Sequence, residues 1–173
     1  MKKILFIFCT LILISSCSEN SDTMKNLKDS ESFLSMNAVK EGVNQIEPGL
    51  QYQVINSGSP DSLQLQSDNF VTAHFHGTLM DGSVFWSSVD SNEPLKTNLS
   101  QLIVGCQKAM SLMRVGDKWR VFIHPSLAYG EQGRPGIPAN SALIFEIEIL
   151  GERRPCKITI EAPFDPTGER MRS

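Results

Sequence analysis

Residues 71–85, VTAHFHGTLMDGSVF, carry the pattern that decides the fold of this 173-residue chain. From Val71 to Phe75, apolar residues alternate with polar ones, which is the two-residue period of a strand with one buried face. The Asp81-Gly82 pair that follows is a strong short hairpin signal, because a tight turn between twisted strands needs positive φ angles. The stretch therefore predicts a β-hairpin whose apolar face must be covered by another element.

Segments further along the chain supply the rest of the sheet and its cover. The same alternation predicts three more strands, at residues 50–54, 118–123 and 143–149. Between Leu99 and Met113 the apolar spacing becomes three or four residues, which indicates an amphipathic helix that ends by Gly116. A short N-terminal helix is predicted over residues 33–44. We expect an α+β domain in which a twisted antiparallel β-sheet wraps around one short α-helix.

The N-terminus has the sequence of a secretory signal, predicted over residues 1–16. Its apolar run from Ile4 to Ile14 is shorter than the ~20 residues that a membrane-spanning helix needs. Residues 13–17, LISSC, resemble a bacterial lipobox, which predicts lipidation of Cys17 and anchoring to the cell envelope. Plain cleavage to a free periplasmic protein is the alternative. The non-acidic Ser18 resembles an outer-membrane address, with the domain facing the periplasm.

The two ends of the mature chain have the composition of extensions. Residues 17–32 are polar and almost free of apolar side chains, which predicts a tether, and residues 151–173 contain three prolines, which predicts a loosely packed extension. Removal of residues 1–16 takes away two lysines and no acid, so the formal net charge falls from -3 to -5. Without a basic stripe, nucleic acid is excluded as a class of partner.

The cysteines and histidines offer weaker signals. Cys106 and Cys156 are the two thiols left to pair in an oxidising compartment, but their spacing does not place them together, so separate thiols are favoured. Cys106 on an apolar helix face is typical of an inert buried cysteine. His74 and His76 share one strand face, but two ligands are too few for a metal site. A solvated or hydrogen-bonded pair is favoured for them.

Five ordered motifs run through the second half of the chain: residues 74–78 (HFHGT), 81–85 (DGSVF), 115–120 (VGDKWR), 128–130 (AYG) and 137–141 (IPANS). Together they resemble FKBP-type peptidyl-prolyl cis-trans isomerases. Residues 33–54 resemble the lead-in of the macrophage infectivity potentiator branch of that family. The resemblance implies an isomerase domain over residues 45–150 that assists protein folding in the envelope, with unfolded or flexible proline-containing proteins as partners.

The resemblance also implies a pocket for proline. It makes Tyr129, Phe85 and Phe145 the catalytic residues, with the Tyr129 hydroxyl offered to a substrate carbonyl. The further substrate-binding residues that it implies are Phe75, Trp86, Leu102, Ile103, Cys106 and Ile137. No cofactor or metal is implied, whereas a macrolide ligand is. Without the resemblance, aromatic residues on alternating strands favour core positions, and a tyrosine in a Gly/Pro loop favours a surface anchor.

Two positions depart from the family pattern, and both belong to the implied pocket. Trp86 stands where the family has an aspartate, and Cys106 stands where it has the tryptophan of the pocket floor. The first change removes an acceptor, and the second removes much of the roughly 150–250 Å² that an aromatic side chain covers. Trp86 refilling the space above Cys106 is one hypothesis. The sequence thus leaves two functions open: an isomerase of reduced activity, or a proline-peptide-binding chaperone module with weak or no turnover.

Overall fold

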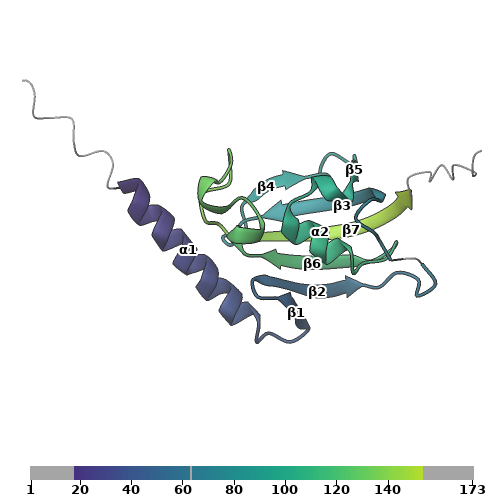
Figure 1. Cartoon of the computed structure of the whole chain (residues 1–173), viewed down its shortest axis with the longest axis horizontal. Coiled ribbons are helices and arrows are strands. Elements are labelled where there is room, and N and C mark those ends of the chain that lie inside the picture. Colours follow the sequence, from purple (N-terminus) through teal and green to yellow (C-terminus); the bar gives the residue numbers. More distant parts are fainter. Residues whose placement is uncertain (1–17, 63, 154–173) are drawn as a thin grey trace, which may run out of the picture.

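The computed structural model describes residues 18–62 and 64–153 (Figure 1). One antiparallel sheet has the strand order β1-β2-β6-β7-β3-β4, and β5 also pairs with β3. Its strands are β1 (Val43–Glu47), β2 (Leu50–Asn56), β3 (Phe70–Thr78), β4 (Val84–Ser87), β5 (Leu95–Asn98), β6 (Lys118–Ile123) and β7 (Leu143–Arg153). The helices are α1 (Ser18–Asn37) and α2 (Val104–Met110), with 3-10 turns η1 (Leu99–Gln101), η2 (Pro125–Leu127) and η3 (Gly130–Gln132). The predicted α+β class is confirmed.

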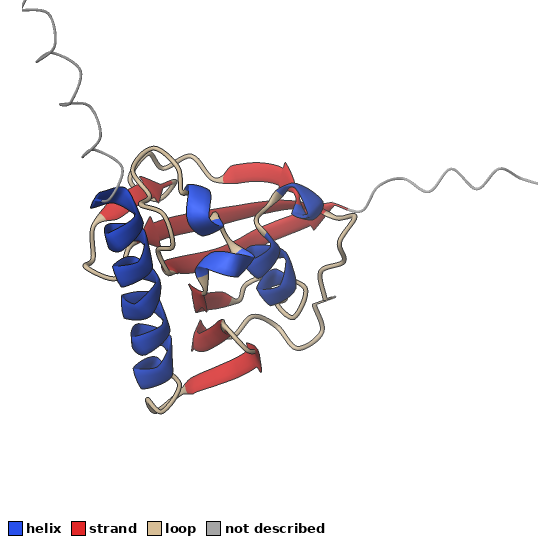
Figure 2. Ribbon diagram, turned by 60° about the vertical axis from the view of Figure 1, so that its left-hand side comes forward, coloured by secondary structure: helices blue, strands red, loops and turns tan. Residues whose placement is uncertain are grey.

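The core lies between α2 and one face of the sheet (Figure 2). Alternate residues of β3, β6 and β7 point inward, so that Phe75, Val121 and Ile147 are all at most 2% exposed. Met110 of α2 is fully buried against this face. Each such side chain contributes about 1.5–3 kcal/mol when it is completely buried. The alternation in the sequence therefore predicted the inward faces of these strands correctly. The helix predicted between Leu99 and Met113 is shorter in the structure, where η1 covers Leu99–Gln101 and α2 covers Val104–Met110.

The β3–β4 hairpin forms as the Asp81-Gly82 signal predicted. Gly82 has φ +85°, a conformation that glycine adopts without steric cost. The Asp81 carboxylate accepts hydrogen bonds from the Ser83 hydroxyl at 2.6 Å and the Ser83 backbone N–H at 2.9 Å. These two bonds, the hydroxyl bond first, lower the pKa of Asp81. In the paired strands, Gly77 lies opposite Trp86, which fixes which side chains of β4 face the core side of the hairpin.

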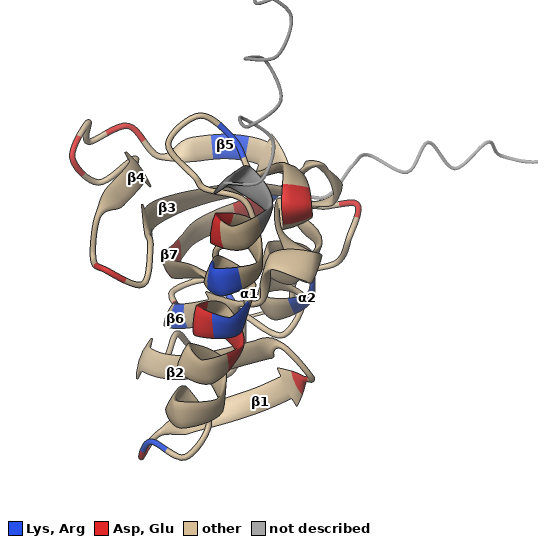
Figure 3. Cartoon of the chain, turned by 90° about the vertical axis from the view of Figure 1, so that its left-hand side faces the viewer, with Lys and Arg blue, Asp and Glu red and all other residues tan. Residues whose placement is uncertain are grey.

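The N-terminal segment differs from the sequence prediction. A tether over residues 17–32 and a helix over 33–44 were expected, but a single helix, α1, begins at Ser18, ends at Asn37 and crosses one end of the sheet (Figures 1 and 3). The side of α1 that faces the sheet carries polar residues such as Asn26, Ser30 and Asn37, which are hydrogen-bonded to the rest of the chain. A helix that docks through polar groups lacks the apolar stripe by which helices are recognised in sequence.

β2 and β7 show two smaller differences. On β2, Gln51 is 4% exposed and bonded to Asn37, whereas Val54, predicted to face inward, is 42% exposed. Gln51 is buried because α1 covers its face of the strand, where Gln51 accepts from Asn37 and donates to the carbonyl of Leu34. β7 continues through Arg153 in register with β3, so the extension predicted from residue 151 begins with strand. Residues 1–17, including the predicted signal peptide and Cys17, and residues 154–173, including Cys156, lie outside the described residues.

The charged side chains of the described helices lie mainly on α1. Neither α1 nor α2 is both long and apolar enough to cross a membrane. Along α1 the basic residues Lys25 and Lys28 lie between acidic residues on both sides (Figure 3), and Lys25 pairs with Asp29 one turn later at 3.2 Å. Such an exposed pair contributes only a few tenths of a kcal/mol, so α1 depends on its docked face for stability.

Candidate functional site

A cavity of about 510 Å³ opens between the β3–β4 hairpin, α2 and the loop that joins β6 to β7. The nine residues that the sequence assigned to catalysis or substrate binding all line this one cavity: Phe75, Phe85, Trp86, Leu102, Ile103, Cys106, Tyr129, Ile137 and Phe145. Residues from four separate parts of the chain are thus brought together by the sheet and α2. The lining also contains residues that the sequence did not indicate: Leu95, Gln101, Arg134 and Pro135.

Aromatic rings form one wall of the pocket. The Phe145 ring meets the Phe85 ring edge-on at 5.4 Å and 87°, and meets the Phe75 ring edge-on at 6.3 Å and 86°. Edge-to-face pairs of this kind add about 0.5–1.5 kcal/mol each beyond the area that they bury. Gly77 lies directly behind this wall, because a Cβ at that position would stand 2.6 Å from Cζ of Phe85. The absence of a side chain at Gly77 is what lets the rings lie against β3.

The two departures from the family pattern occupy different parts of the pocket. Cys106 comes from α2, is 2% exposed and has its pKa raised to about 12 by burial, so its thiol is neutral. The prediction that Cys106 is buried is confirmed. The Trp86 ring packs against Phe75 with 6.0 Å between centroids and remains 42% exposed. Trp86 thus extends the aromatic surface at the edge of the pocket.

The β6–β7 loop contributes the polar groups of the pocket. Tyr129 lies just before η3 with φ −105° and ψ 0°, and within the described part of the chain its hydroxyl has no hydrogen-bond partner. The Arg134 guanidinium lies 4.7 Å from the centre of the Tyr129 ring, a cation–π contact that holds the two side chains together. Arg134 and Pro135 follow Gly133 in a stretch without periodicity, so only their closeness to Tyr129 in the sequence could have marked them.

A mostly apolar pocket with one available hydroxyl and no acidic side chain in its lining is suited to binding a cyclic apolar side chain next to an amide. The family model for FKBP-type peptidyl-prolyl cis-trans isomerase matches residues 62–150, which include the whole lining of this pocket. The chain belongs to the FKBP-type peptidyl-prolyl cis-trans isomerase family. A second model, described as the domain amino terminal to FKBP-type peptidyl-prolyl isomerase, matches residues 15–54.

Relatives of the FKBP family match most of the chain. It is 41% identical over 142 residues to the FKBP-type peptidyl-prolyl cis-trans isomerase FkpA of Aeromonas hydrophila, covering 82% of this chain and 52% of that protein. It is 33% identical to the outer membrane protein MIP of Legionella longbeachae, covering 89% and 66%. The crystal structure of FkpA from Escherichia coli superposes with a TM-score of 0.75 at 32% identity, covering 79% and 63%. The chain thus spans about half to two thirds of the length of these relatives.

The histidines of this FKBP domain have local partners. His74 and His76 of β3 are hydrogen-bonded to the hydroxyls of Ser88 and Ser87, each at 3.0 Å. Of the two expected alternatives, solvated or hydrogen-bonded, the structure has hydrogen bonds, and they join β3 to β4 and the turn after it. Within residues 18–62 and 64–153, no group of three or more His, Cys, Asp and Glu side chains is arranged to hold a metal ion.

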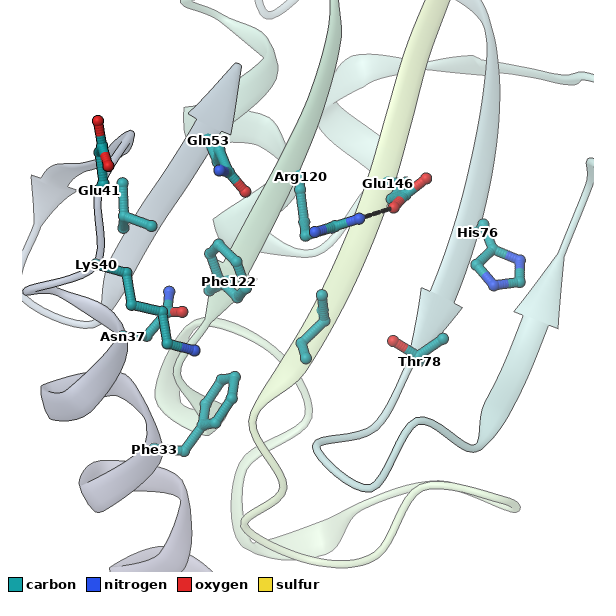
Figure 4. Close-up of a pocket in the computed structure, with 12 residues that line it drawn as sticks. Phe33, Asn37, Lys40, Glu41, Gln53, His76, Thr78, Arg120, Phe122 and Glu146 are labelled. Carbon is teal, nitrogen blue, oxygen red and sulfur yellow. Dashed lines mark hydrogen bonds and ion pairs between the residues drawn. The ribbon is translucent and has the colours of Figure 1, made fainter. Parts of the chain in front are cut away.

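A second cavity of the FKBP domain, about 430 Å³, lies between α1 and the face of the sheet opposite to α2 (Figure 4). It contains none of the predicted site residues. Two of its four charged residues are paired, since Arg120 is bonded to Glu146 at 2.5 Å, and the Lys40 ammonium lies 5.9 Å from the centre of the Phe33 ring. Phe33 also meets Phe122 of β6 at 6.2 Å. This cavity marks the junction of α1 with the sheet, whereas the aromatic pocket carries the site.

Proposed function

We propose that this protein is a peptidyl-prolyl cis-trans isomerase that acts on flexible or unfolded proline-containing segments in the bacterial cell envelope. The convergence of the nine expected residues on one apolar pocket is the observation that carries the proposal. The reaction is rotation about an X-Pro bond, whose barrier of ~18–20 kcal/mol comes from amide resonance. No covalent bond breaks, so aromatic walls and a hydrogen-bond donor are sufficient machinery.

The pocket accelerates rotation by favouring the twisted amide over the planar one. Phe85 and Phe145 hold the proline ring against a dry surface, which removes water from an amide whose planar form is the more polar one. The Tyr129 hydroxyl donates to a carbonyl of the bound segment and fixes its position relative to the ring. Because the walls hold no ionised carboxylate and Cys106 is neutral, no proton transfer enters the reaction.

Because Trp86 replaces the family's aspartate and Cys106 replaces its tryptophan, a chaperone module with little turnover is the alternative outcome of the refolding assay. With Trp86 in place of an acceptor, the pocket gains apolar area at its edge and loses a group that could orient a substrate N–H. Such a pocket retains affinity for proline rings even where turnover is lower. We propose isomerisation as the main activity because the aromatic wall and the Tyr129 hydroxyl are both present.

A proline-limited refolding assay with a matched pair of tyrosine variants tests this function. Tyr129→Phe removes the pocket hydroxyl, and we expect kcat/KM to fall by about 2–13-fold, which corresponds to the about 0.5–1.5 kcal/mol of one hydrogen bond. Tyr52→Phe is the control, because Tyr52 is not part of the pocket lining. Its ring stacks on the Trp119 ring with 4.3 Å between centroids. Wild-type protein that binds proline peptides without accelerating refolding would instead establish the chaperone module.

We further propose that Cys17 is lipidated and that the protein is held at the outer membrane, facing the periplasm. The lipobox-like sequence of residues 13–17 supports the lipid, and the Legionella longbeachae relative is named an outer membrane protein. A macrolide is the small-molecule ligand that the aromatic pocket is expected to accept, in competition with proline peptides. Inhibition of the refolding assay by such a ligand measures this directly.

A further inference from the structure

The β6–β7 loop lines the pocket with one part and contacts α1 with another. Tyr129, Arg134 and Ile137 face the pocket, while residues 139–142 lie against the polar face of α1. The loop contains three glycines with positive φ angles: Gly130, Gly133 and Gly136. Glycines permit many backbone conformations, so the loop's own sequence gives it little stiffness. Its shape therefore depends on hydrogen bonds, some within the loop, such as those between Arg134 and Ile137, and others to α1.

Ser30 and Asn26 of α1 supply these contacts. Ser30 is completely buried, and its hydroxyl both donates to the carbonyl of Asn140 and accepts from the N–H of Ala142, each at 2.8 Å. The Asn26 side-chain amide donates to the Ala139 carbonyl and, at 2.9 Å, to the Ser141 hydroxyl. An amide group has two N–H donors, so it can make both bonds at once. Four bonds thus join two α1 side chains to four consecutive loop residues.

Asn140 links this contact to the catalytic side of the loop. Its φ is +56°, a left-handed conformation that is unusual outside glycine and must be held by its surroundings. Its side chain is 4% exposed and donates to the carbonyl of Thr23 in α1 at 3.3 Å. Its backbone N–H donates to the carbonyl of Gly130 at 2.8 Å, directly after Tyr129. A movement of α1 is therefore passed to the residue beside the pocket hydroxyl through one strained position.

We propose that Asn26, Ser30 and Asn140 form a loop clamp that positions Tyr129 and Ile137 for catalysis, so that α1 is a working part of the isomerase site. The clamp residues are positioning residues, since they line no part of the pocket themselves. Their role rests on the proposed function, because it assigns them to the same reaction. When the clamp is open, only the fraction of molecules with the correct loop shape binds and turns over substrate.

The test compares Ser30→Ala with Ser35→Ala, two identical substitutions on one helix. Ser30 is buried in the clamp, whereas Ser35 is exposed. At 10 °C we expect Ser30→Ala to lower kcat/KM by roughly tenfold, less than the about 10²-fold that a 1 Å misplacement can cause. Ser35→Ala should match wild type. Amide hydrogen exchange over residues 130–142 should become faster in Ser30→Ala and not in Ser35→Ala. If Ser30 only stabilised the fold in general, the faster exchange would not be confined to this loop.

A pair of substitutions at Asn140 tests the coupling itself. Asn140→Gly keeps the left-handed backbone and the bonds to Ser30 and Gly130, whereas Asn140→Ala disfavours that conformation. We expect Asn140→Gly to retain more activity and slower loop exchange than Asn140→Ala. If Ser30→Ala does not fold, Asn26→Ala replaces it in the same measurements. Asn26 is only partly buried, so its substitution disturbs folding less.

Two results separate the clamp from the function on which it rests. A folded Ser30→Ala variant with wild-type kcat/KM and wild-type exchange over residues 130–142 would overturn the clamp. A wild-type protein without isomerase activity would overturn the proposed function. In that case, the clamp would still be tested by comparing Ser30→Ala with wild type in amide hydrogen exchange over the loop and in affinity for a proline peptide.

Discussion

Gly77→Ala is the change that probes the aromatic wall most directly. An added Cβ would lie 2.6 and 2.7 Å from Cζ and Cε2 of Phe85, and 2.9 Å from Cε1 of Phe145. Carbon atoms pack at about 3.5–4.0 Å, so the Phe85 ring has to move by roughly 1 Å. Away from β3, the open direction for this ring is the pocket. The substitution therefore narrows the pocket without removing any group from it.

The structure gives two magnitudes for this variant. Overpacking costs about 1–3 kcal/mol of stability, which lowers the melting temperature by about 4 °C per kcal/mol in a domain of this size. Misplacement of a wall by 1 Å can lower kcat/KM by about 10²-fold. Activity measured at 10 °C, where uncatalysed isomerisation takes minutes and the variant is still folded, separates the second effect from the first.

Gly151→Ala is the matched control for Gly77→Ala. Gly151 is also a strand glycine of the same sheet, but a Cβ there meets no atom within 4 Å, and its φ lies outside the left-handed range. We expect its stability to stay within about 1 kcal/mol of wild type and its activity to be unchanged. A Gly77→Ala variant that is destabilised but keeps wild-type kcat/KM at 10 °C would show that substrate does not use the wall of Phe85 and Phe145.

Three further predictions concern Trp86 and the cysteines. Trp86→Asp restores the acceptor that the family has beside its ligand, so we expect equal or higher isomerase activity and tighter macrolide binding; loss of both in a folded variant would make Trp86 itself part of the working pocket. Cys17→Ser should abolish metabolic labelling with a radioactive fatty acid, and undiminished labelling would remove the lipid anchor from the proposal. The pKa of Cys106 is raised by burial from 9.0 to about 12, so the native state holds its proton longer than the unfolded state does. The free energy of unfolding should therefore be unaffected by this thiol below pH 9 and fall by about 1.4 kcal/mol per pH unit between there and pH 12. Urea unfolding of wild type and Cys106→Ala across this range measures the difference, and parallel curves would contradict the burial of the thiol.

The sequence predicted best where apolar side chains determine an element. The inward faces of β3, β6 and β7 follow from alternation, because each of these strands buries one face against α2. The short edge strands β1 and β5 were not predicted, since their few residues carry no clear alternation. The part of α1 before Phe33 was missed for a different reason: Asn26 and Ser30 are hydrogen-bonded to the rest of the chain, and in a sequence such residues look like those of an exposed tether.

The pocket depended on resemblance and not on periodicity. Phe75 and Phe145 obey the same alternation as core residues, and they are in fact also buried, so the pattern alone could not tell pocket from core. Arg134 and Pro135 lie in a loop whose shape is set by glycines and by bonds to α1, which no local pattern reports. They belong to the lining because the fold places this loop opposite β4 and α2.

The direction of α1 bears on which polypeptides the pocket can meet. Its 20 residues span about 30 Å, and its early turns are the ones that touch the loop beside Tyr129. Cys17 immediately precedes Ser18 in the sequence, while β7 ends on the opposite side of the domain (Figure 1). With lipid on Cys17 as proposed, the β6–β7 loop that lines the pocket stands near the bilayer surface. Chains that are being threaded through or inserted into that membrane then encounter the isomerase at a far higher local concentration than chains that diffuse in the periplasm.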